Sequence, residues 1–339
     1  MDEKGFVEGM REYIAQLNRE KRYSSAKSYQ DALNSFIRYS GTDCIAYSAI
    51  NKDNLRRYEA YLLENGCMRN TISTYMRRLR CIYNKAVENG KAEFIPTLFK
   101  GIFTGVESKR KKSLPIEDLH RLMTVPVEDG KQRKTQLALC LMFLFGGMSF
   151  VDFAHLKTGN IKNGILDYNR QKTGTPMRLE ILETAETMYK ELSGEKVRDS
   201  GYLFPFLSGT REGREEYLEY NAALFRFNRN LKALKEFAGI TSDVTSYTIR
   251  HSFAMTLKEQ NVPIEMISEL LGHKSIKTTQ IYLRSFSLGK MTEVNSASLS
   301  TWRSGLMPRI APALAVSIIM NLKRGEATWR VAYSFTAQM

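Results

Sequence analysis

Four side chains in this chain carry functional groups that could act together on a phosphodiester. Arg250, His273 and Tyr282 lie within SYTIRHSFAMTLKEQNVPIEMISELLGHKSIKTTQIYLRSF, and Lys172 lies upstream in RQKTGT. Cleavage requires a nucleophile, groups that neutralise the charge developing on the phosphate, and a proton for the leaving oxygen. A phenol, a guanidinium, an imidazole and an ammonium are suitable groups for these tasks.

Taken one at a time, each of these residues has a plainer structural interpretation, which we favour for any one alone. A tyrosine after an apolar helix is normally part of the core or the surface. An Arg-His pair is usually a surface feature, and a histidine after Leu-Gly often only interacts with the dipole of a helix C-terminus. These residues therefore indicate a catalytic function only through their order and spacing as a set.

The elements that would position these residues are mainly helical. Helical patterns run over residues 217–237 and, after the turn-like GITSDVTS, over residues 247–262. Pro263 begins a short helix that Gly272 ends. Ser275 can cap one more helix, over SIKTTQIYL.

A β-hairpin is predicted around Lys172. Strand-like residues between positions 160 and 182 flank the sequence Lys-Thr-Gly-Thr, which is a turn signal. Because side chains two positions apart in a strand point the same way, Arg170 and Lys172 would share one face near the hairpin tip.

As an ordered set, these motifs resemble the tyrosine recombinase (phage integrase) family. The matching features are R-H-S at Arg250, L-G-H at His273, Tyr282 at the family's spacing from that histidine, and the hairpin K-T-G at Lys172. The segment LFGGMSFVDFAHLK resembles the family's first box, with the residue pattern typical of members from Bacteroidetes mobile and invertible elements. The resemblance covers residues from about 10 to about 290.

The resemblance implies a role for each residue. Tyr282 would attack the scissile phosphate and form a 3′-phosphotyrosyl link, freeing a 5′-hydroxyl without ATP, metal or cofactor. The guanidinium of Arg250 would hold two non-bridging oxygens. Lys172 would protonate the leaving oxygen, and His273 would hydrogen-bond the phosphate or accept the tyrosine proton.

Two positions depart from the family pattern. The first box usually carries an arginine where this chain has Ser149, and the second box usually begins with a histidine where this chain has Tyr247. We hypothesise that Arg170 substitutes for the missing arginine; the alternative is that it contacts only a neighbouring phosphate. Tyr247 would donate its hydroxyl in place of the histidine. Asp152 stands where the family has an acid, and we interpret it as orienting or structural.

The first hundred residues are predicted to form a compact helical unit. Three helices are expected, beginning near Ser24 or Ser25, Asp53 and Asn70. The basic residues of the third helix and of the segment that follows it are either a solvated face or contacts to DNA phosphates. The candidate DNA-binding residues are Arg69, Arg77, Arg78, Arg80, Lys85, Lys109, Arg110, Lys111 and Lys112.

Composition agrees with a nucleic-acid partner. The 339 residues include 50 Lys and Arg against 36 Asp and Glu, a formal net charge of +14, which is typical of proteins that meet a polyanion. The four cysteines stand apart without a CxxC pair, so neither a disulfide framework nor a zinc ribbon is supported. No apolar run reaches the roughly 20 residues of a membrane helix. We expect a cytoplasmic, nucleoid-associated protein.

The predicted fold is mainly α. A helical core-binding (SAM-like) domain is expected over residues 1–105, a basic linker over 106–112, and a mostly helical DNA breaking-rejoining catalytic domain with a small antiparallel sheet over 113–290. Residues 291–339 resemble nothing in the family and would be either a protomer-docking segment or a poorly ordered extension.

The resemblance implies a site-specific recombinase that acts on double-stranded DNA sites as a homotetramer in synapsis. Accessory DNA-bending proteins are candidate partners. The chain starts directly with the core-binding unit, which favours a DNA invertase or simple resolvase over an accessory-dependent integrase. Two alternatives are a catalytically weakened DNA-binding regulator and a type IB topoisomerase-like relaxase.

Overall fold

The computed structural model describes residues 5–107, 113–194, 201–283 and Ser296, apart from the side chains of Ile281 and Tyr282. The basic cluster Lys109, Arg110, Lys111 and Lys112 lies outside the described residues, as does nearly all of the C-terminal segment 291–339. Among the helices described, none combines the length and the apolar character needed to cross a membrane.

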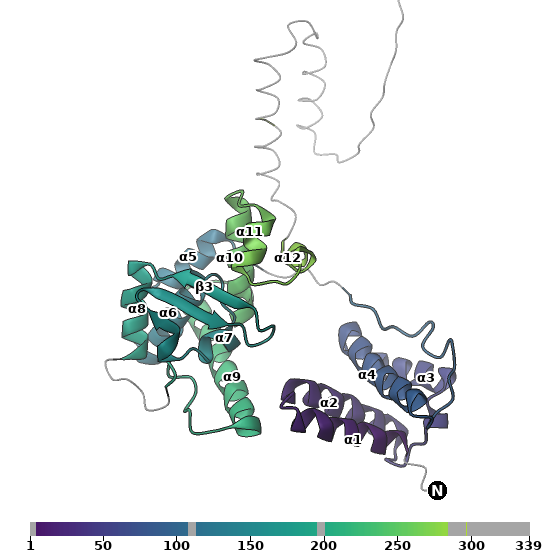
Figure 1. The fold of residues 1–339 in the computed structure, drawn as a ribbon. Helices are drawn as coiled ribbons and strands as arrows, with labels where there is room; N and C mark the ends of the chain where they lie inside the picture. The colour runs from purple at the N-terminus through teal and green to yellow at the C-terminus, as the bar shows by residue number, and fades with distance from the viewer. Residues whose placement is uncertain (1–4, 108–112, 195–200, 284–295, 297–339) are drawn as a thin grey trace, which may run out of the picture. The chain divides into compact units, whose positions relative to one another are not determined.

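The N-terminal unit is a bundle of α-helices around one hydrophobic core (Figure 1). Phe6, Met10, Leu33, Phe36 and Tyr58 are among its fully buried side chains. The elements are α1 (Phe6–Arg19), α2 (Tyr23–Ser40), the 3₁₀ helix η1 (Tyr47–Ala49), α3 (Lys52–Glu64) and α4 (Arg69–Glu88).

Helix α1 was not predicted from the sequence, and two of the expected helix caps differ from those in the structure. The apolar residues of α1 recur at helical spacing (Phe6, Met10, Ile14 and Leu17), so the pattern was present although charged residues surround it. α2 begins at Tyr23, before the expected serine caps. Asn70 lies inside α4 and instead holds the backbone at Glu107, donating from Nδ2 to its carbonyl and accepting from its N–H, both at 2.8 Å.

The second unit combines helices with a small sheet. Its elements are α5 (Ile116–Thr124), α6 (Gly130–Leu144), α7 (Phe150–Ala154), η2 (Thr158–Asn160), β1 (Ile161–Lys162), β2 (Ile165–Asn169), β3 (Pro176–Glu180), α8 (Glu183–Ser193), α9 (Gly213–Phe237), α10 (Ser246–Glu259), α11 (Ile264–Leu270) and α12 (Ile276–Tyr282). The apolar residues of α6 are buried on all sides, which places this helix at the centre of the core.

The sheet is antiparallel with strand order β1-β2-β3. β2 pairs with β3 from Ile165 opposite Glu180 to Asn169 opposite Pro176. Leu166, Tyr168 and Met177 point into the same core as the helices. The predicted hairpin around Lys172 is thus confirmed, as is a mainly α fold with a small antiparallel sheet.

Candidate active site

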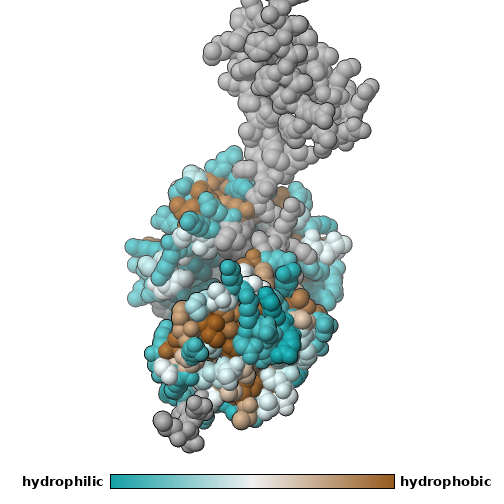
Figure 2. Space-filling view, turned by 90° about the vertical axis from the view of Figure 1, so that its right-hand side faces the viewer, coloured by the Kyte–Doolittle hydropathy of each residue, from teal (hydrophilic) through white to brown (hydrophobic). Residues whose placement is uncertain are grey.

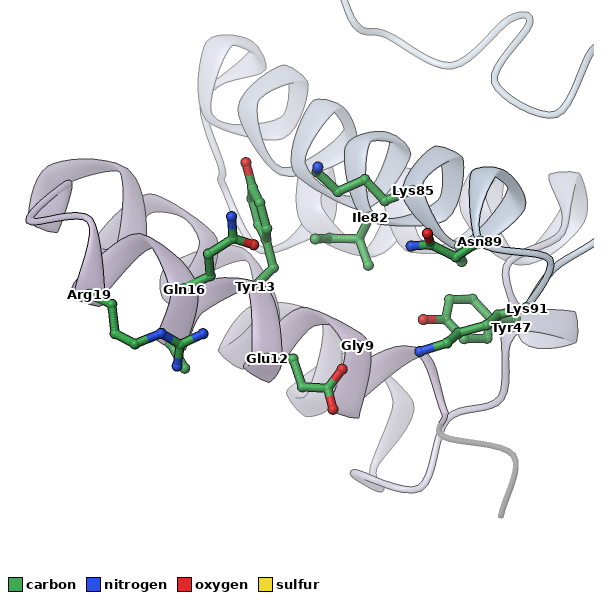
Figure 3. Close-up of a pocket in the computed structure, with 12 residues that line it drawn as sticks. Gly9, Glu12, Tyr13, Gln16, Arg19, Tyr47, Ile82, Lys85, Asn89 and Lys91 are labelled. Atoms are coloured by element: carbon green, nitrogen blue, oxygen red, sulfur yellow. The ribbon is translucent and has the colours of Figure 1, made fainter. Parts of the chain in front are cut away.

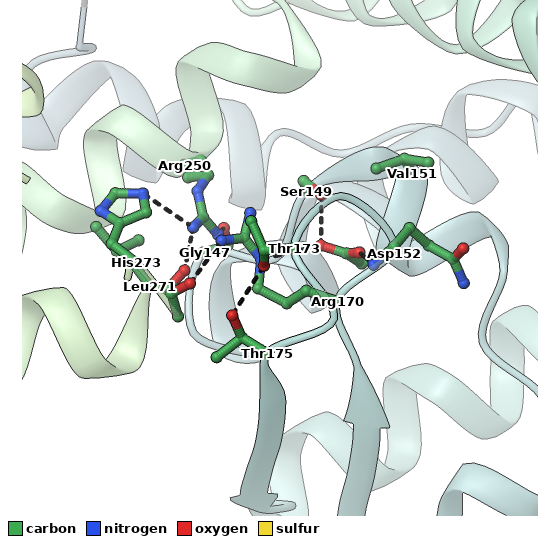
Figure 4. Close-up of polar contacts among 12 residues, drawn as sticks. Gly147, Ser149, Val151, Asp152, Arg170, Thr173, Thr175, Arg250, Leu271 and His273 are labelled. Atoms are coloured by element: carbon green, nitrogen blue, oxygen red, sulfur yellow. Dashed lines mark hydrogen bonds and ion pairs between the residues drawn. The ribbon is translucent and has the colours of Figure 1, made fainter. Parts of the chain in front are cut away.

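Arg250 lies on α10, and its side chain is 2% exposed. Thr245 begins this helix as a capping box, accepting a hydrogen bond from the Thr248 N–H. The guanidinium donates from Nη1 to the Gly147 carbonyl at 2.8 Å and from Nη2 to the Leu271 carbonyl. It therefore ties the loop after α6 to the turn after α11, as Figure 4 shows.

His273 follows that turn and contacts Arg250 directly. Its Nε2 is 3.4 Å from Arg250 Nη2, and its Nδ1 is 2.9 Å from Thr279 Oγ1 on α12. Arg250 and His273, twenty-three residues apart in the sequence, thus lie side by side in the folded chain (Figure 4).

Arg170 is brought to the same turn from the sheet side. It directly follows β2, is 8% exposed, and donates from Nη1 to the Gly272 carbonyl at 2.8 Å. Arg250 donates to the carbonyl of Leu271, the residue before Gly272. The two guanidinium groups therefore bind consecutive peptide units. In the view of Figure 4, both arginines lie between His273 and Asp152.

Asp152 holds Arg170 in place. The residue is 3% exposed, and its Oδ2 lies 3.6 Å from Arg170 Nε and accepts from Ser149 Oγ at 2.6 Å. Its Oδ1 accepts from the Gln171 N–H at 2.7 Å. The serine in the first box therefore binds the same acid that anchors Arg170.

The charges around Tyr168 place both arginines in one electrostatic environment. Burial raises the pKa of the Tyr168 phenol on β2, and the carboxylate of Asp152 raises it further. The positive charges of Arg250 and Arg170 act in the opposite direction on the same group. One phenol therefore senses both guanidinium groups and the acid that anchors one of them.

Gly272 allows the close approach of Arg170. Its φ of +59° lies in the left-handed region, and a Cβ at this position would lie 2.7 Å from Arg170 Cδ. A side chain would therefore displace the arginine and strain the turn.

The prediction that Arg170 and Lys172 share one face of a strand is wrong. β2 ends at Asn169, and both residues lie in the six-residue connection 170–175, where Gly174 N–H donates to the Arg170 carbonyl. The alternation of side chains in a strand does not extend into this turn. Arg170 is buried, whereas Lys172 is exposed.

The remaining two catalytic candidates lie on helices. Tyr247 is 47% exposed on α10, one turn before Arg250, and packs edge-on against the His251 ring with centroids 4.6 Å apart. Tyr282 is the last residue of α12. Its backbone is described by the structure, whereas its side chain is not. Its helix also carries Thr279, which was not among the site residues predicted from the sequence.

The basic candidates on α4 fall into two groups. Arg69, Arg77 and Arg80 are exposed, although Arg69 also lies 4.8 Å over the Phe103 ring, whereas Arg78 and Lys85 are half-buried. Arg78 donates to Ser28 Oγ and lies 4.8 Å over the Tyr29 ring, and Lys85 Nζ lies 4.8 Å over the Tyr13 ring. These two cations are held by aromatic side chains of neighbouring helices rather than extended into solvent.

Lys85 also borders a cavity of about 460 Å³ between α1 and α4 (Figure 3). Tyr13, Gln16, Asn89 and Lys91 line the same cavity.

On the face of the molecule drawn in Figure 2, hydrophobic residues gather in a patch beside strongly hydrophilic residues. Among the described side chains, no group of three His, Cys, Asp or Glu residues is placed to hold a metal ion.

Comparison with known proteins identifies both units. Residues 5–100 match the phage integrase SAM-like domain, and residues 112–287 match the phage integrase family. The chain is 30% identical over 243 residues to tyrosine recombinase XerA of Pyrococcus furiosus, covering 70% of this chain and 77% of the relative. It is 30% identical over 274 residues to tyrosine recombinase XerD of Rhizobium meliloti, covering 76% and 83%.

Solved structures share the fold. A lambda integrase tetramer bound to a Holliday junction superposes with a TM-score of 0.60 at 15% identity, covering 88% of this chain and 79% of that chain. The Tn1549 transposon integrase in complex with a circular intermediate DNA gives 0.61 at 13% identity, covering 86% and 99%.

Proposed function

The chain belongs to the phage integrase family of site-specific tyrosine recombinases, enzymes that break and rejoin DNA, and we propose that Tyr282 is its nucleophile. The observation that carries the proposal is the convergence of Arg250, Arg170 and His273 on the turn that leads into α12, at whose end Tyr282 lies. Two cations and an imidazole gathered beside a tyrosine-bearing helix suit an anionic phosphate.

The chemistry follows from the groups at this turn. The Tyr282 oxygen attacks the phosphorus, the bond to the 5′-oxygen breaks, and a 3′-phosphotyrosyl link forms that conserves the phosphodiester energy. Lys172, exposed in the connection between β2 and β3, can reach the leaving 5′-oxygen and give it a proton. His273 accepts the phenolic proton or hydrogen-bonds the phosphate.

Arg170 replaces the missing first-box arginine in this proposal. Its support is the pair of consecutive carbonyls that bind Arg250 and Arg170, together with the Asp152 carboxylate that anchors Arg170. Ser149, bonded to that carboxylate, supports the anchor instead of the phosphate. Tyr247, exposed one turn before Arg250, donates its hydroxyl to a phosphate oxygen.

We expect Arg170→Ala to slow formation of the covalent DNA adduct by about 10²–10³, the usual effect of losing one charge-stabilising donor. The measurement is single-turnover adduct formation on a nicked duplex, with DNA binding followed separately. Because loss of a partner from a buried ion pair also destabilises the fold, Arg170→Lys serves as a second variant that keeps the charge but not the fork.

Arg178→Ala on β3 is the matched control, because this arginine is exposed on the neighbouring strand. Adduct formation within a few-fold of wild type in both Arg170 variants would mean that Arg170 contacts only a neighbouring phosphate.

The proposed organisation has a core-site DNA-binding domain at residues 1–105, a linker at 106–112, a catalytic domain at 113–290 and a C-terminal segment at 291–339. The core-binding domain and the catalytic domain of one protomer would clamp duplex DNA from opposite sides. Four protomers would exchange strands between two DNA sites in the nucleoid. The exposed Arg69, Arg77 and Arg80 on α4 are the preferred phosphate contacts. The residue pattern of the first box favours a Bacteroidetes-type invertase or integrase.

The recombinase activity is tested on a plasmid with two copies of a bound site. Binding sites are first selected from a randomised duplex library and then cloned in direct and in inverted orientation. Deletion from direct repeats and inversion between inverted repeats are expected. Relaxation without any preference for a site pair would favour the topoisomerase-like alternative, and binding without a covalent adduct would favour the regulator.

A further inference from the structure

Thr279 is a fully buried polar residue next to the site. Its exposed fraction is 0%, and it lies on α12, one helical turn before the backbone of Tyr282. Its Oγ1 is 2.9 Å from Nδ1 of His273. The threonine thus joins the helix that carries the proposed nucleophile to the imidazole beside Arg250.

Two contacts of the His273 imidazole indicate its tautomer. A guanidinium has only donors, so Nε2 of His273 must be the acceptor in its 3.4 Å contact with Arg250 Nη2. A neutral imidazole carries one proton, which then lies on Nδ1 and is donated to Thr279 Oγ1. Thr279 is therefore the acceptor that keeps the lone pair of Nε2 on the side of Arg250.

We propose that Thr279 is a positioning residue that fixes the tautomer and ring orientation of His273 and couples them to the placement of α12. Without the Oγ1 acceptor, the proton on Nδ1 loses its partner and the ring can rotate or exchange tautomers. Once it no longer accepts from Arg250, the lone pair on Nε2 can accept the proton that leaves Tyr282 as the tyrosine oxygen attacks phosphorus. It cannot donate to a phosphate oxygen, so this tautomer corresponds to the first of the two roles proposed for His273. This inference rests on the proposed function of His273 and Tyr282.

Thr279→Val is the test variant, because valine keeps the shape and removes the hydroxyl. We expect about a 10-fold slower adduct formation, the scale on which loss of an orienting hydrogen bond acts on the histidine that it holds. Thr279→Ser restores the hydroxyl and is expected to recover most of the rate. Thr278→Val is the matched control, since Thr278 is exposed on the same helix.

A double-variant cycle separates positioning from a merely structural role. In a His273→Ala background, Thr279→Val should change the rate by less than about twofold, because the group it orients is gone. An equal loss in both backgrounds, or no rescue by Thr279→Ser, would overturn the proposal.

A readout independent of catalysis is the ¹⁵N spectrum of labelled histidines in the full chain. The chain has four histidines, and the signal absent from His273→Gln identifies His273. We expect protonated Nδ1 in the wild type, and in Thr279→Val a shift toward protonated Nε2. Protonated Nε2 in the wild type, or an unchanged spectrum in Thr279→Val, would refute the role of Thr279 whether or not the wild type forms an adduct. Absence of that adduct would count against the proposed function alone.

Discussion

Replacing Tyr282 with Phe is expected to abolish the covalent adduct with DNA and to leave DNA binding within a few-fold of wild type. The change removes only the phenolic oxygen, the atom that would be esterified to the phosphate. Loss of the nucleophile from a covalent enzyme lowers the rate on the order of 10⁶-fold, so no adduct is expected in any practical assay time.

The adduct is measured on a nicked suicide duplex, in which the strand released by cleavage diffuses away and the protein remains attached to DNA. Tyr189→Phe on α8 is the matched control, because it removes the same oxygen from a half-buried tyrosine elsewhere in the second unit. An adduct that persists in Tyr282→Phe would show that one of the other tyrosines is the nucleophile, and peptide mapping of the adduct would identify it.

The helices and the hairpin were predictable because their signals are local. Apolar residues at helical spacing, the proline that begins α11, the glycine that ends its turn and the turn sequence after β2 each act within a few residues. α1 shows the same spacing at Phe6, Met10, Ile14 and Leu17 and could have been found. Its charged neighbours obscured a pattern that the core of the N-terminal unit makes plain.

The arrangement of the site was only partly predictable. Arg250, His273 and Arg170 were predicted to belong to one site, and the structure brings all three to one turn. The geometry by which Arg170 arrives there was not predictable, because the end of a strand depends on pairing with its neighbour. The roles of Asp152 and Thr279 depend on contacts that only the tertiary fold creates. Asp152 Oδ2 lies 3.6 Å from Arg170 Nε, and Thr279 Oγ1 lies 2.9 Å from His273 Nδ1.

Arg250→Ala is expected to lower the rate of adduct formation on the order of 10⁴-fold, because one lost donor costs about 10²–10³ and a guanidinium presents two to the phosphate. The same change removes the donor from the buried carbonyls of Gly147 and Leu271, which costs about 1–3 kcal/mol for each group left unsatisfied. The free energy of unfolding must therefore be measured beside the rate.

Arg250→Lys distinguishes these two effects. A lysine keeps one positive charge but cannot span two carbonyls or hold two oxygens in a plane, so a loss of about 10² or more should remain in protein shown to be folded. Arg121→Lys on α5 is the matched control, because this arginine is half exposed and pairs with Asp118. If Arg250→Lys were folded, bound DNA and formed the adduct within a few-fold of wild type, the guanidinium would serve only to join Gly147 to Leu271, and the phosphate would have to be held by other groups.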